Sequence, residues 1–244
     1  MKKKTRWPIY LIIGLIITFI AFTVPLPYYI EVPGTSEDIR KVLQVNNQPD
    51  QEEGSYQFVT VGVKHARLVD LVYAWLTPFT DIRSAKEMTG GSSDTEYMRI
   101  NQFYMETSQN MAKYQGLKTA GKEIELKYLG VYVLTVTDNS TFKGILNIAD
   151  TVTAVNDKTF ESSKEMVDYV NSQTLGDKVK VTYQEDGKVK TAEGKIITLE
   201  NGKNGIGIGL IDRTEVSSDV PIKFSTAGIG GPSAGMMFSL SIYT

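Results

Sequence analysis

The sequence predicts an α+β protein in which an apolar N-terminal helix precedes two different kinds of folded region. Three observations lead to this expectation. An uncharged apolar run extends to residue 24, a helical pattern of apolar side chains follows residue 93, and several short strand-like runs begin near residue 122. Helices and strands that are grouped in this way are typical of α+β folds. The 244 residues are enough for one or two domains behind the apolar helix.

The N-terminal apolar run predicts the location of the protein. It carries no charge from Ile9 to Val24, which is close to the ~20 residues that cross a bilayer as a helix. The basic residues before it, a type that stays in the cytoplasm, are Lys2, Lys3, Lys4 and Arg6. We therefore expect a single-pass cell-membrane protein with an uncleaved transmembrane signal-anchor within residues 1–30 and everything after Glu31 extracytoplasmic. A cleaved signal peptide is the alternative, although residues 21–25 lack a clean small-x-small cleavage site.

The composition excludes several kinds of site. The net charge of −2 predicts no strong basic surface, so we expect no nucleic-acid partner. Cysteine is absent, which excludes disulfides, a thiol nucleophile and a zinc-thiolate centre. The single histidine, His65, cannot form a histidine metal cluster, and we expect it at the surface near the end of a strand. No phosphate-binding Gly-x-x-x-x-Gly-Lys-Ser/Thr loop occurs, so we expect no metal, no cofactor and no use of ATP.

The first folded region contains one strand and two helices. Residues 56–63 are rich in β-branched and aromatic side chains and predict a strand. Residues 68–76 predict a short apolar helix that stops before Pro78. Ser93 and Glu96 form a capping box that starts a long helix, which Gly116 or Gly121 can end. Its expected core-facing side chains are Tyr97, Met98, Ile100, Tyr104, Met105, Met111 and Ala112.

Short strands with one helix among them follow residue 122. Strands are predicted at residues 126–129, 131–136 and 151–155. Residues 162–172 predict an amphipathic helix with Met166, Val167 and Val170 on its apolar side. The dipeptide Asp186-Gly187 between two alternating runs predicts a hairpin. Residues 201–209 are interpreted as a glycine-rich link before a last strand at residues 220–225, on which Lys223 points to solvent.

A glycine-rich turn near the end of the chain delivers one serine to an apolar run. The turn reads Gly230-Gly231-Pro232-Ser233-Ala234-Gly235, and residues 236–240 predict a buried helix. Free N–H groups and the positive end of the helix dipole meet at such a helix start. A nucleophilic serine needs this place, because attack on a carbonyl creates an oxyanion that N–H groups stabilise. An ordinary helix N-cap is the alternative for Ser233.

Residues 122–199 resemble a PDZ domain. Residues 128–133 are similar to the loop and strand that receive the terminal carboxylate of a peptide, and residues 148–157 resemble the family's Gly-Asp-x-Ile-x-x-Val-Asn-Gly run, with Ala149 and Asp157 replacing two glycines. The resemblance implies that a peptide adds as a strand beside residues 131–136, against the helix at residues 162–172. A PDZ-like fold packed against its neighbour without a peptide is the alternative. The implied peptide contacts are Leu129, Gly130, Val131, Tyr132, Val133, Met166 and Val170.

The serine motif is similar to the Gly-Pro-Ser-Ala-Gly motif of Lon-type proteases, residue for residue over residues 231–235. Residues 56–120 look like the first half of that proteolytic domain. The whole order resembles the membrane-anchored Lon-like serine proteases with an internal PDZ domain, including those that process peptide pheromones. The expected domains are an anchor at 1–30, a first protease part at 31–121, a PDZ domain at 122–200, and a second, truncated protease part at 201–244.

The resemblance implies an ATP-independent serine endopeptidase that cleaves secreted peptides or proteins, a pheromone among them. Ser233 would be the nucleophile of a Ser-Lys dyad, and Gly231, Pro232 and Ala234 would shape the oxyanion loop. The family's lysine lies beyond Thr244, so we expect this 244-residue form to be nearly inactive. An inactive, peptide-binding PDZ tether is the alternative. A C-terminal processing peptidase and a trypsin-like enzyme that uses His65 fit less well, because their serine motifs differ.

Overall fold

The computed structural model describes residues 7–244, and the chain divides into two compact units. The first unit contains residues 59–94 and the N-terminal part of the chain up to residue 37. The second contains residues 38–58 and 95–244. The basic residues from Lys2 to Arg6, which carried the predicted orientation, lie outside the described residues. Each unit is described by itself below.

The first unit combines helices with a three-stranded sheet of order β3-β1-β4. Its elements are α1 (Trp7–Thr23), β1 (Pro25–Asp38), β3 (Gln57–Arg67), α2 (Leu68–Leu76), β4 (Asp81–Ser84) and α3 (Ala85–Thr89). The last residue of β1 and the first two residues of β3 belong to the second unit. Strands β1 and β4 are antiparallel, with Tyr28 opposite Ser84 and Glu31 opposite Asp81. The predicted strand at 56–63 is confirmed within β3, and the predicted helix at 68–76 has the bounds of α2.

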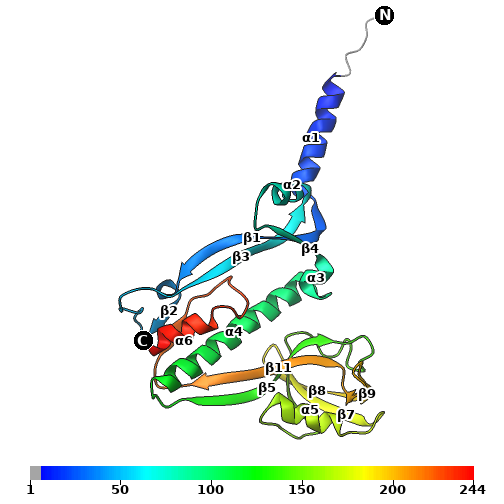
Figure 1. Ribbon diagram of the computed structural model, residues 1–244. Coiled ribbons are helices and arrows are strands. Elements are labelled where there is room, and N and C mark those ends of the chain that lie inside the picture. Colours follow the sequence, from blue (N-terminus) through cyan, green and yellow to red (C-terminus); the bar gives the residue numbers. More distant parts are fainter. Residues whose placement is uncertain (1–6) are drawn as a thin grey trace, which may run out of the picture. The chain divides into compact units, whose positions relative to one another are not determined.

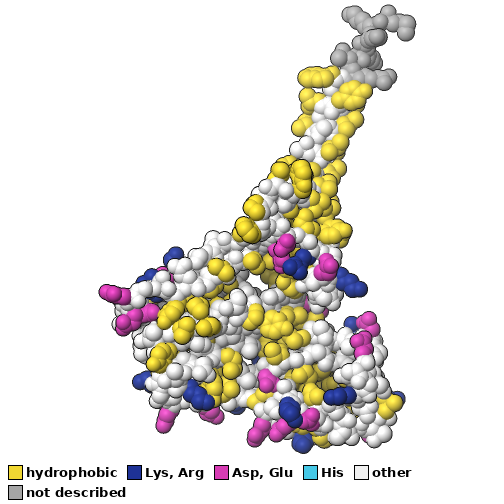
Figure 2. All heavy atoms as spheres, viewed as in Figure 1, with side chains coloured by type: hydrophobic (Ala, Val, Ile, Leu, Met, Phe, Trp, Pro, Cys, Tyr) yellow, Lys and Arg dark blue, Asp and Glu magenta, His cyan; other side chains and the backbone are white. Residues whose placement is uncertain are grey.

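The N-terminal helix corrects two predictions. Apolar side chains cover α1 along its length (Figure 2). Across residues 7–244, however, no helix combines the length and the apolar character that are required to cross a membrane. The 17 residues of α1 rise about 26 Å, whereas the hydrocarbon core of a bilayer is about 30 Å thick. The predicted transmembrane signal-anchor in the fold class is therefore wrong, and so is the predicted single-pass location in the cell membrane.

The second unit is built from a long helix, a five-stranded sheet and a small layer around the C-terminal helix. Its elements are η1 (Ile39–Lys41), β2 (Leu43–Val45), α4 (Asp94–Thr119), β5 (Glu125–Val136), β6 (Thr151–Val155), α5 (Ser163–Asn171), β7 (Lys178–Glu185), β8 (Lys188–Lys195), β9 (Ile197–Thr198), β10 (Asn204–Gly205), β11 (Ile208–Ser217), β12 (Ile222–Phe224) and α6 (Gly235–Tyr243). The first residue of α4, Asp94, belongs to the first unit.

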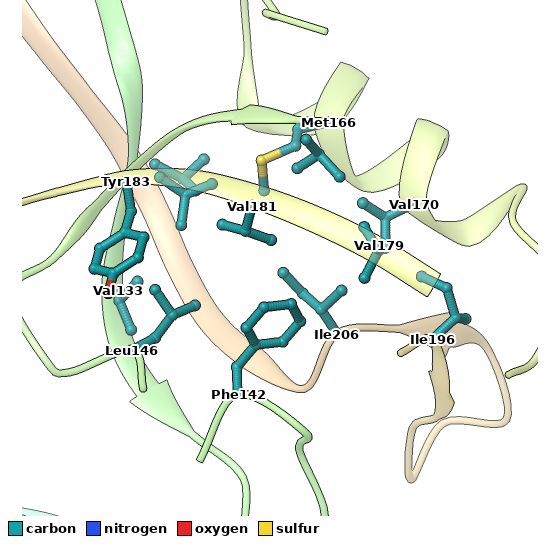
Figure 3. Close-up of a cluster of buried hydrophobic side chains, with 13 residues drawn as sticks. Val133, Phe142, Leu146, Met166, Val170, Val179, Val181, Tyr183, Ile196 and Ile206 are labelled. Carbon is teal, nitrogen blue, oxygen red and sulfur yellow. The ribbon is translucent and has the colours of Figure 1, made fainter. Parts of the chain in front are cut away.

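The five-stranded sheet has the order β11-β5-β6-β7-β8, with antiparallel neighbours throughout. Helix α5 covers one side of it, and the core between them is drawn in Figure 3. Met166 and Val170 of α5 lie over Val179 and Val181 of β7 in this core. The β7–β8 hairpin turns at Asp186 and Gly187, whose φ values of 47° and 77° are those of the predicted turn. The predicted hairpin is therefore confirmed, as are the strand at 151–155 and the amphipathic helix.

Helices α4 and α6 pack closely in a second core of the same unit (Figure 1). Gly116 of α4 permits this contact, because a Cβ atom there would lie 2.8 Å from the Cβ atom of Ile242 and 2.9 Å from the carbonyl oxygen of Ser239. Phe238 of α6 is fully buried and meets Phe224 of β12 edge to face, with ring centroids 5.0 Å apart. The C-terminal apolar run is thus a core helix, as its composition predicted.

The predicted apolar stripe of the long helix is only partly correct. Met105 and Ala112 are buried, but Met98 and Met111 are exposed. Helix α4 contacts two partners instead of one. One side meets α6, and on another side Phe103 stacks on Tyr132 of β5 with ring centroids 3.7 Å apart. A helix that packs on two sides does not present the single stripe that a 3.6-residue period predicts.

Candidate functional site

A groove runs between the edge strand of the sheet and helix α5. One wall is the helix, and the opposite wall is strand β11 with the turn that precedes it. The lining residues are Met166, Val167, Val170, Asn171, Leu199, Gly205, Ile206, Gly207, Ile208 and Leu210. All but Asn171 are apolar or glycine, so side chains that enter the groove meet a hydrocarbon surface. We call this feature the β11–α5 groove.

Strand β11 is a sheet edge. It pairs with β5 on one side, and no other strand of the described residues lies on its opposite side. An unpaired strand edge presents a row of backbone N–H and C=O groups that can pair with another extended chain. Because this edge borders the apolar face of α5, a strand that pairs with it would bring its side chains to the helix. The groove therefore has the two parts needed for strand addition.

The turn at the start of β11 offers free backbone donors. Among the residues that the structure describes, the N–H groups of Ile206 and Gly207 have no hydrogen-bond acceptor. Their carbonyl groups hold the turn in place. The Ile206 oxygen accepts from Ser140 Oγ at 2.6 Å, and the Gly207 oxygen accepts from the N–H of Thr137 at 2.9 Å. Two fixed N–H groups at the end of an apolar groove are suited to an anionic group such as a carboxylate.

Gly207 is required at this turn. Its φ of +74° lies in the left-handed region, and a Cβ atom would lie 2.6 Å from Thr137 Oγ1 and 2.8 Å from Ser140 Cβ. Any other residue would combine backbone strain with a steric clash. The chain can therefore place the two free N–H groups beside the groove only with glycine at this position.

The predicted peptide contacts divide into two groups. Met166 and Val170 lie in the wall of the β11–α5 groove, and their contact with a peptide stays a prediction. Residues 129–133, from Leu129 to Val133, lie elsewhere. They belong to β5, which pairs with β11 on one side and with β6 on the other, so this part of the prediction needs correction.

The individual side chains explain why β5 is not a binding edge. Val131 and Val133 are fully buried in the sheet core, and Tyr132 stacks on Phe103. Gly130 lies against β6, since a Cβ atom there would be 2.3 Å from the carbonyl oxygen of Val152. A peptide could not pair beside residues 131–136 unless it displaced β11.

Sequence reasoning missed the residues that form the turn and the free edge. Residues 205–210 read Gly-Ile-Gly-Ile-Gly-Leu, a strict alternation of glycine with an aliphatic residue. The three glycines suggested a flexible link. In a strand, however, alternate residues point to the same face, so glycine at every second position is also typical of a strand that has no room for side chains on one face. Gly209 has this property, because a Cβ atom would lie 2.4 Å from Thr135 Oγ1 of β5. The two-residue alternation was therefore the signal from which a strand could have been predicted here.

The serine loop lies at the start of α6 in the second unit. Ser233 is exposed and stands two residues before Gly235, the first residue of α6. The N-cap of the helix is Ala234, which is fully buried. The loop is braced by α4, because Gly231 donates its N–H to the Asn101 carbonyl at 2.8 Å. The predicted helix start is therefore confirmed, while the predicted roles of Ser233, Gly231, Pro232 and Ala234 in catalysis stay predictions.

Among the described residues of the second unit, no lysine forms a hydrogen bond with Ser233. Lys223 is exposed on β12, whereas Ile222 and Phe224 on either side of it pack against the core, as predicted. A serine hydroxyl without a base is a weak nucleophile.

The single histidine lies in a polar cluster of the first unit. His65 Nε2 is 2.6 Å from Asp94 Oδ2, and its ring lies against that of Tyr29, with centroids 4.3 Å apart and the planes tilted by 30°. The Tyr29 hydroxyl also bonds to Asp94, and these bonds from Tyr29 and His65 hold the pKa of Asp94 below its usual value. His65 is the third-last residue of β3 and its side chain is 40% exposed, close to the surface position near a strand end that the sequence predicted. The cluster ties β1 and β3 to the residue that starts α4.

Comparison with known proteins identifies the sheet. The profile of the PDZ domain family matches residues 102–196. The chain contains a PDZ domain. Strand β11 lies beyond the matched residues and beyond the predicted domain end at residue 200, yet it completes the sheet of this PDZ domain. PDZ domains bind peptides or proteins through an exposed sheet edge, so a peptide or protein partner is the expected one.

Solved PDZ domains are similar to about a third of the chain. The PDZ domain of an SdrC-like protein from Listeria monocytogenes is 35% identical, with 36% of this chain and 93% of that chain covered and a TM-score of 0.34. The PDZ domain of an SdrC-like protein from Listeria innocua is 38% identical, with 33% and 92% covered and a TM-score of 0.32. No curated protein matches the chain.

Proposed function

We propose that this protein binds peptides in the β11–α5 groove of its PDZ domain. The observation that carries the proposal is the edge of β11, which has no neighbouring strand on the side that borders the apolar face of α5. An extended peptide would pair with β11 through its backbone, and alternate side chains would enter the groove. Met166 and Val170 from the helix and Leu210 from the strand favour apolar side chains there.

The free N–H groups of Ile206 and Gly207 support a peptide that ends in the groove. The terminal carboxylate would accept from these two donors, and the last side chain would lie among the apolar walls. Hydrogen bonds to an ionised acceptor are about twice as strong as neutral ones. We therefore propose that the preferred ligand is a C-terminus with an aliphatic last residue.

The test uses a fluorescein-labelled ten-residue peptide that ends in valine. Fluorescence polarisation should detect saturable binding of the free acid, and at least about tenfold weaker binding of the C-terminal amide, because the loss of one charge-assisted bond is worth about 1.5–3 kcal/mol. The substitution Leu210→Asp places a charge in the groove and should abolish binding. The control Val189→Asp alters an exposed apolar residue of β8 and should bind as the wild type does. Equal binding by the Leu210→Asp variant would refute the proposal.

A second candidate function is cleavage of a peptide by Ser233, in the manner of Lon-like serine endopeptidases. The exposure of Ser233 beside the N-terminus of α6 supports this proposal, since N–H groups at a helix start can stabilise an oxyanion. The reaction also needs a general base, whose contribution is worth about 10²–10⁴-fold.

Covalent labelling tests the second candidate without a need for turnover. A fluorophosphonate probe should label the wild-type chain slowly, and mass spectrometry should place the adduct on Ser233. The variant Ser233→Ala should lose the adduct, whereas Ser225→Ala, which changes another exposed serine of the same segment, should keep it. Equal labelling of the wild type and Ser233→Ala would count against a nucleophilic role for this serine.

A further inference from the structure

We propose that Ser108, Gln109 and Asn110 of α4 are positioning residues, which set the serine loop according to whether the β11–α5 groove is occupied. The three residues are consecutive on one helix. Two of them bond to the segment that carries Ser233, and the third bonds to the strand that forms the groove. The inference rests on the proposed peptide binding, and it adds a connection between that site and the serine loop.

Two contacts join the helix to the serine loop. Ser108 is buried and donates its hydroxyl to the Pro232 carbonyl at 3.0 Å. Gln109 donates through Nε2 to Thr226 Oγ1 at 2.7 Å. The first contact is tight, because a Cβ atom on Gly235 would lie 2.4 Å from Ser108 Oγ. The loop therefore has little freedom to move without a change in its hydrogen bonds to α4.

One contact joins the same helix to the groove strand. Asn110 donates through Nδ2 to the Thr214 carbonyl at 3.0 Å. This carbonyl lies at an irregularity, because the pairing of β11 with β5 shifts register between Arg213 and Thr214. A β-bulge bends a strand and raises its local twist. Asn110 thus contacts one of the two places where the pairing of β11 with β5 is irregular.

The addition of a peptide strand would make the geometry of β11 differ between the empty and the occupied groove. Near Thr214, β11 pairs with a part of β5 that has no partner in β6, and such two-stranded ribbons twist more than larger sheets. A peptide that pairs with β11 would therefore reduce its twist and shift the bulge. The Thr214 carbonyl would then move relative to Asn110. Because an α-helix is stiff, a displacement of Asn110 also displaces its neighbours Gln109 and Ser108 in the same helix. The β11–α5 groove and the serine loop would then both depend on the position of α4. A shared element of this kind is the physical requirement for coupling between two sites.

Hydrogen exchange in the full 244-residue chain tests the connection. The probe is the valine-terminated free-acid peptide at saturation, and mass spectrometry reads exchange over residues 226–235. In the wild type, peptide binding should change the exchange rate of this segment by at least about fivefold, the lower limit of typical coupling. The variants Asn110→Ala and Gln109→Ala should bind the peptide with an affinity within about twofold of the wild type and lose that change.

A matched control removes an amide that makes no such contact. Gln115 of α4 is exposed and bonds to Thr119 of the same helix, so Gln115→Ala should retain the full peptide response. Saturable binding by the wild type with unchanged exchange over residues 226–235 would overturn this inference alone. A full response in both Asn110→Ala and Gln109→Ala would also overturn it. Failure of the wild type to bind the peptide would overturn the proposed function, and this inference with it.

Discussion

The carboxylate of Asp212 accepts a hydrogen bond from the backbone N–H of Ser163, at 2.9 Å. Asp212 lies on β11, and Ser163 is the first residue of α5, so one strand side chain satisfies a donor at the helix start. The two walls of the β11–α5 groove are therefore held together by a specific bond. A negative charge at this position is also favourable for the helix dipole.

Loss of this bond should open the groove. Asp212→Ala should lower the free energy of unfolding by about 1 kcal/mol, as removal of a helix cap does, and should weaken binding of the valine-terminated peptide. Asp212→Asn keeps an acceptor and should lie closer to the wild type. Urea unfolding and fluorescence polarisation measure the two effects.

The control is Asp168→Ala on the exposed side of the same helix. Asp168 pairs with Lys164 one turn away, and both side chains are exposed. This variant should leave peptide affinity unchanged. If Asp168→Ala and Asp212→Ala weaken binding equally, then the strand–helix bond is not what shapes the groove.

Crowding at Gly207 should make it more sensitive than another left-handed glycine. Gly207→Ala combines a φ of +74° with contacts shorter than 3 Å and should cost about 2–3 kcal/mol. Gly187 in the β7–β8 turn has a φ of +77° but no heavy atom within 4 Å of the added Cβ, so Gly187→Ala should cost about 1 kcal/mol. Thermal unfolding separates the two, and equal losses would show that steric crowding at Gly207 is relieved in solution.

Local signals predicted the elements that depend on local chemistry. Helix α2 stops before Pro78, and the β7–β8 hairpin turns at Asp186-Gly187, as the sequence indicated. Ser162 caps α5 by accepting from the N–H of Glu165. In each case a residue with a restricted backbone or a short polar side chain determines where the element starts or ends, so no distant contact is needed to predict it.

The parts that sequence reasoning missed depend on contacts between distant segments. Only the third of the glycines at 205, 207 and 209 lies in β11, and the other two precede it. Their need for close approach becomes visible only when Leu199, Thr137 and Thr135 are beside them. The resemblance placed the peptide edge on β5, because the sequence does not say that residues 208–217 pair there. The candidate site was therefore predicted on its helix side, at Met166 and Val170, and not on its strand side.

The buried carboxyl of Asp150 should make stability depend on pH. Asp150 is 3% exposed, and its burial raises its pKa above 3.8, although the N–H of Asn147 donates to Oδ2 at 2.8 Å and opposes the rise. Because the folded-state pKa is higher than the unfolded one, the folded state binds more protons between the two values. Its contribution to stability is thus fully present below pH 3.8 and is lost as the pH rises through the folded pKa.

The variant Asp150→Asn keeps an acceptor for Asn147 and cannot ionise. Its free energy of unfolding relative to the wild type should increase as the pH rises above about 4, and should level off once Asp150 is ionised in both states. Urea unfolding between about pH 3.5 and pH 7 measures this difference. A difference that stays constant, or that shrinks as the pH rises, would contradict the raised pKa.

The contact of α4 with α6 predicts that a better helix former will destabilise the protein. Alanine is favoured over glycine in helices by about 1 kcal/mol, yet the Cβ atom of Gly116→Ala would lie 2.8 Å from Ile242. Overpacking of this kind costs about 1–3 kcal/mol, so the net effect should be a loss of stability. Because α6 would have to move, exchange protection over residues 226–235 should fall as well.

The control Gly14→Ala in α1 meets no atom within 4 Å and should not lower the thermal midpoint. A stability of Gly116→Ala equal to or above that of the wild type would mean that the two helices can separate without cost, and that α6 does not hold the serine loop in place.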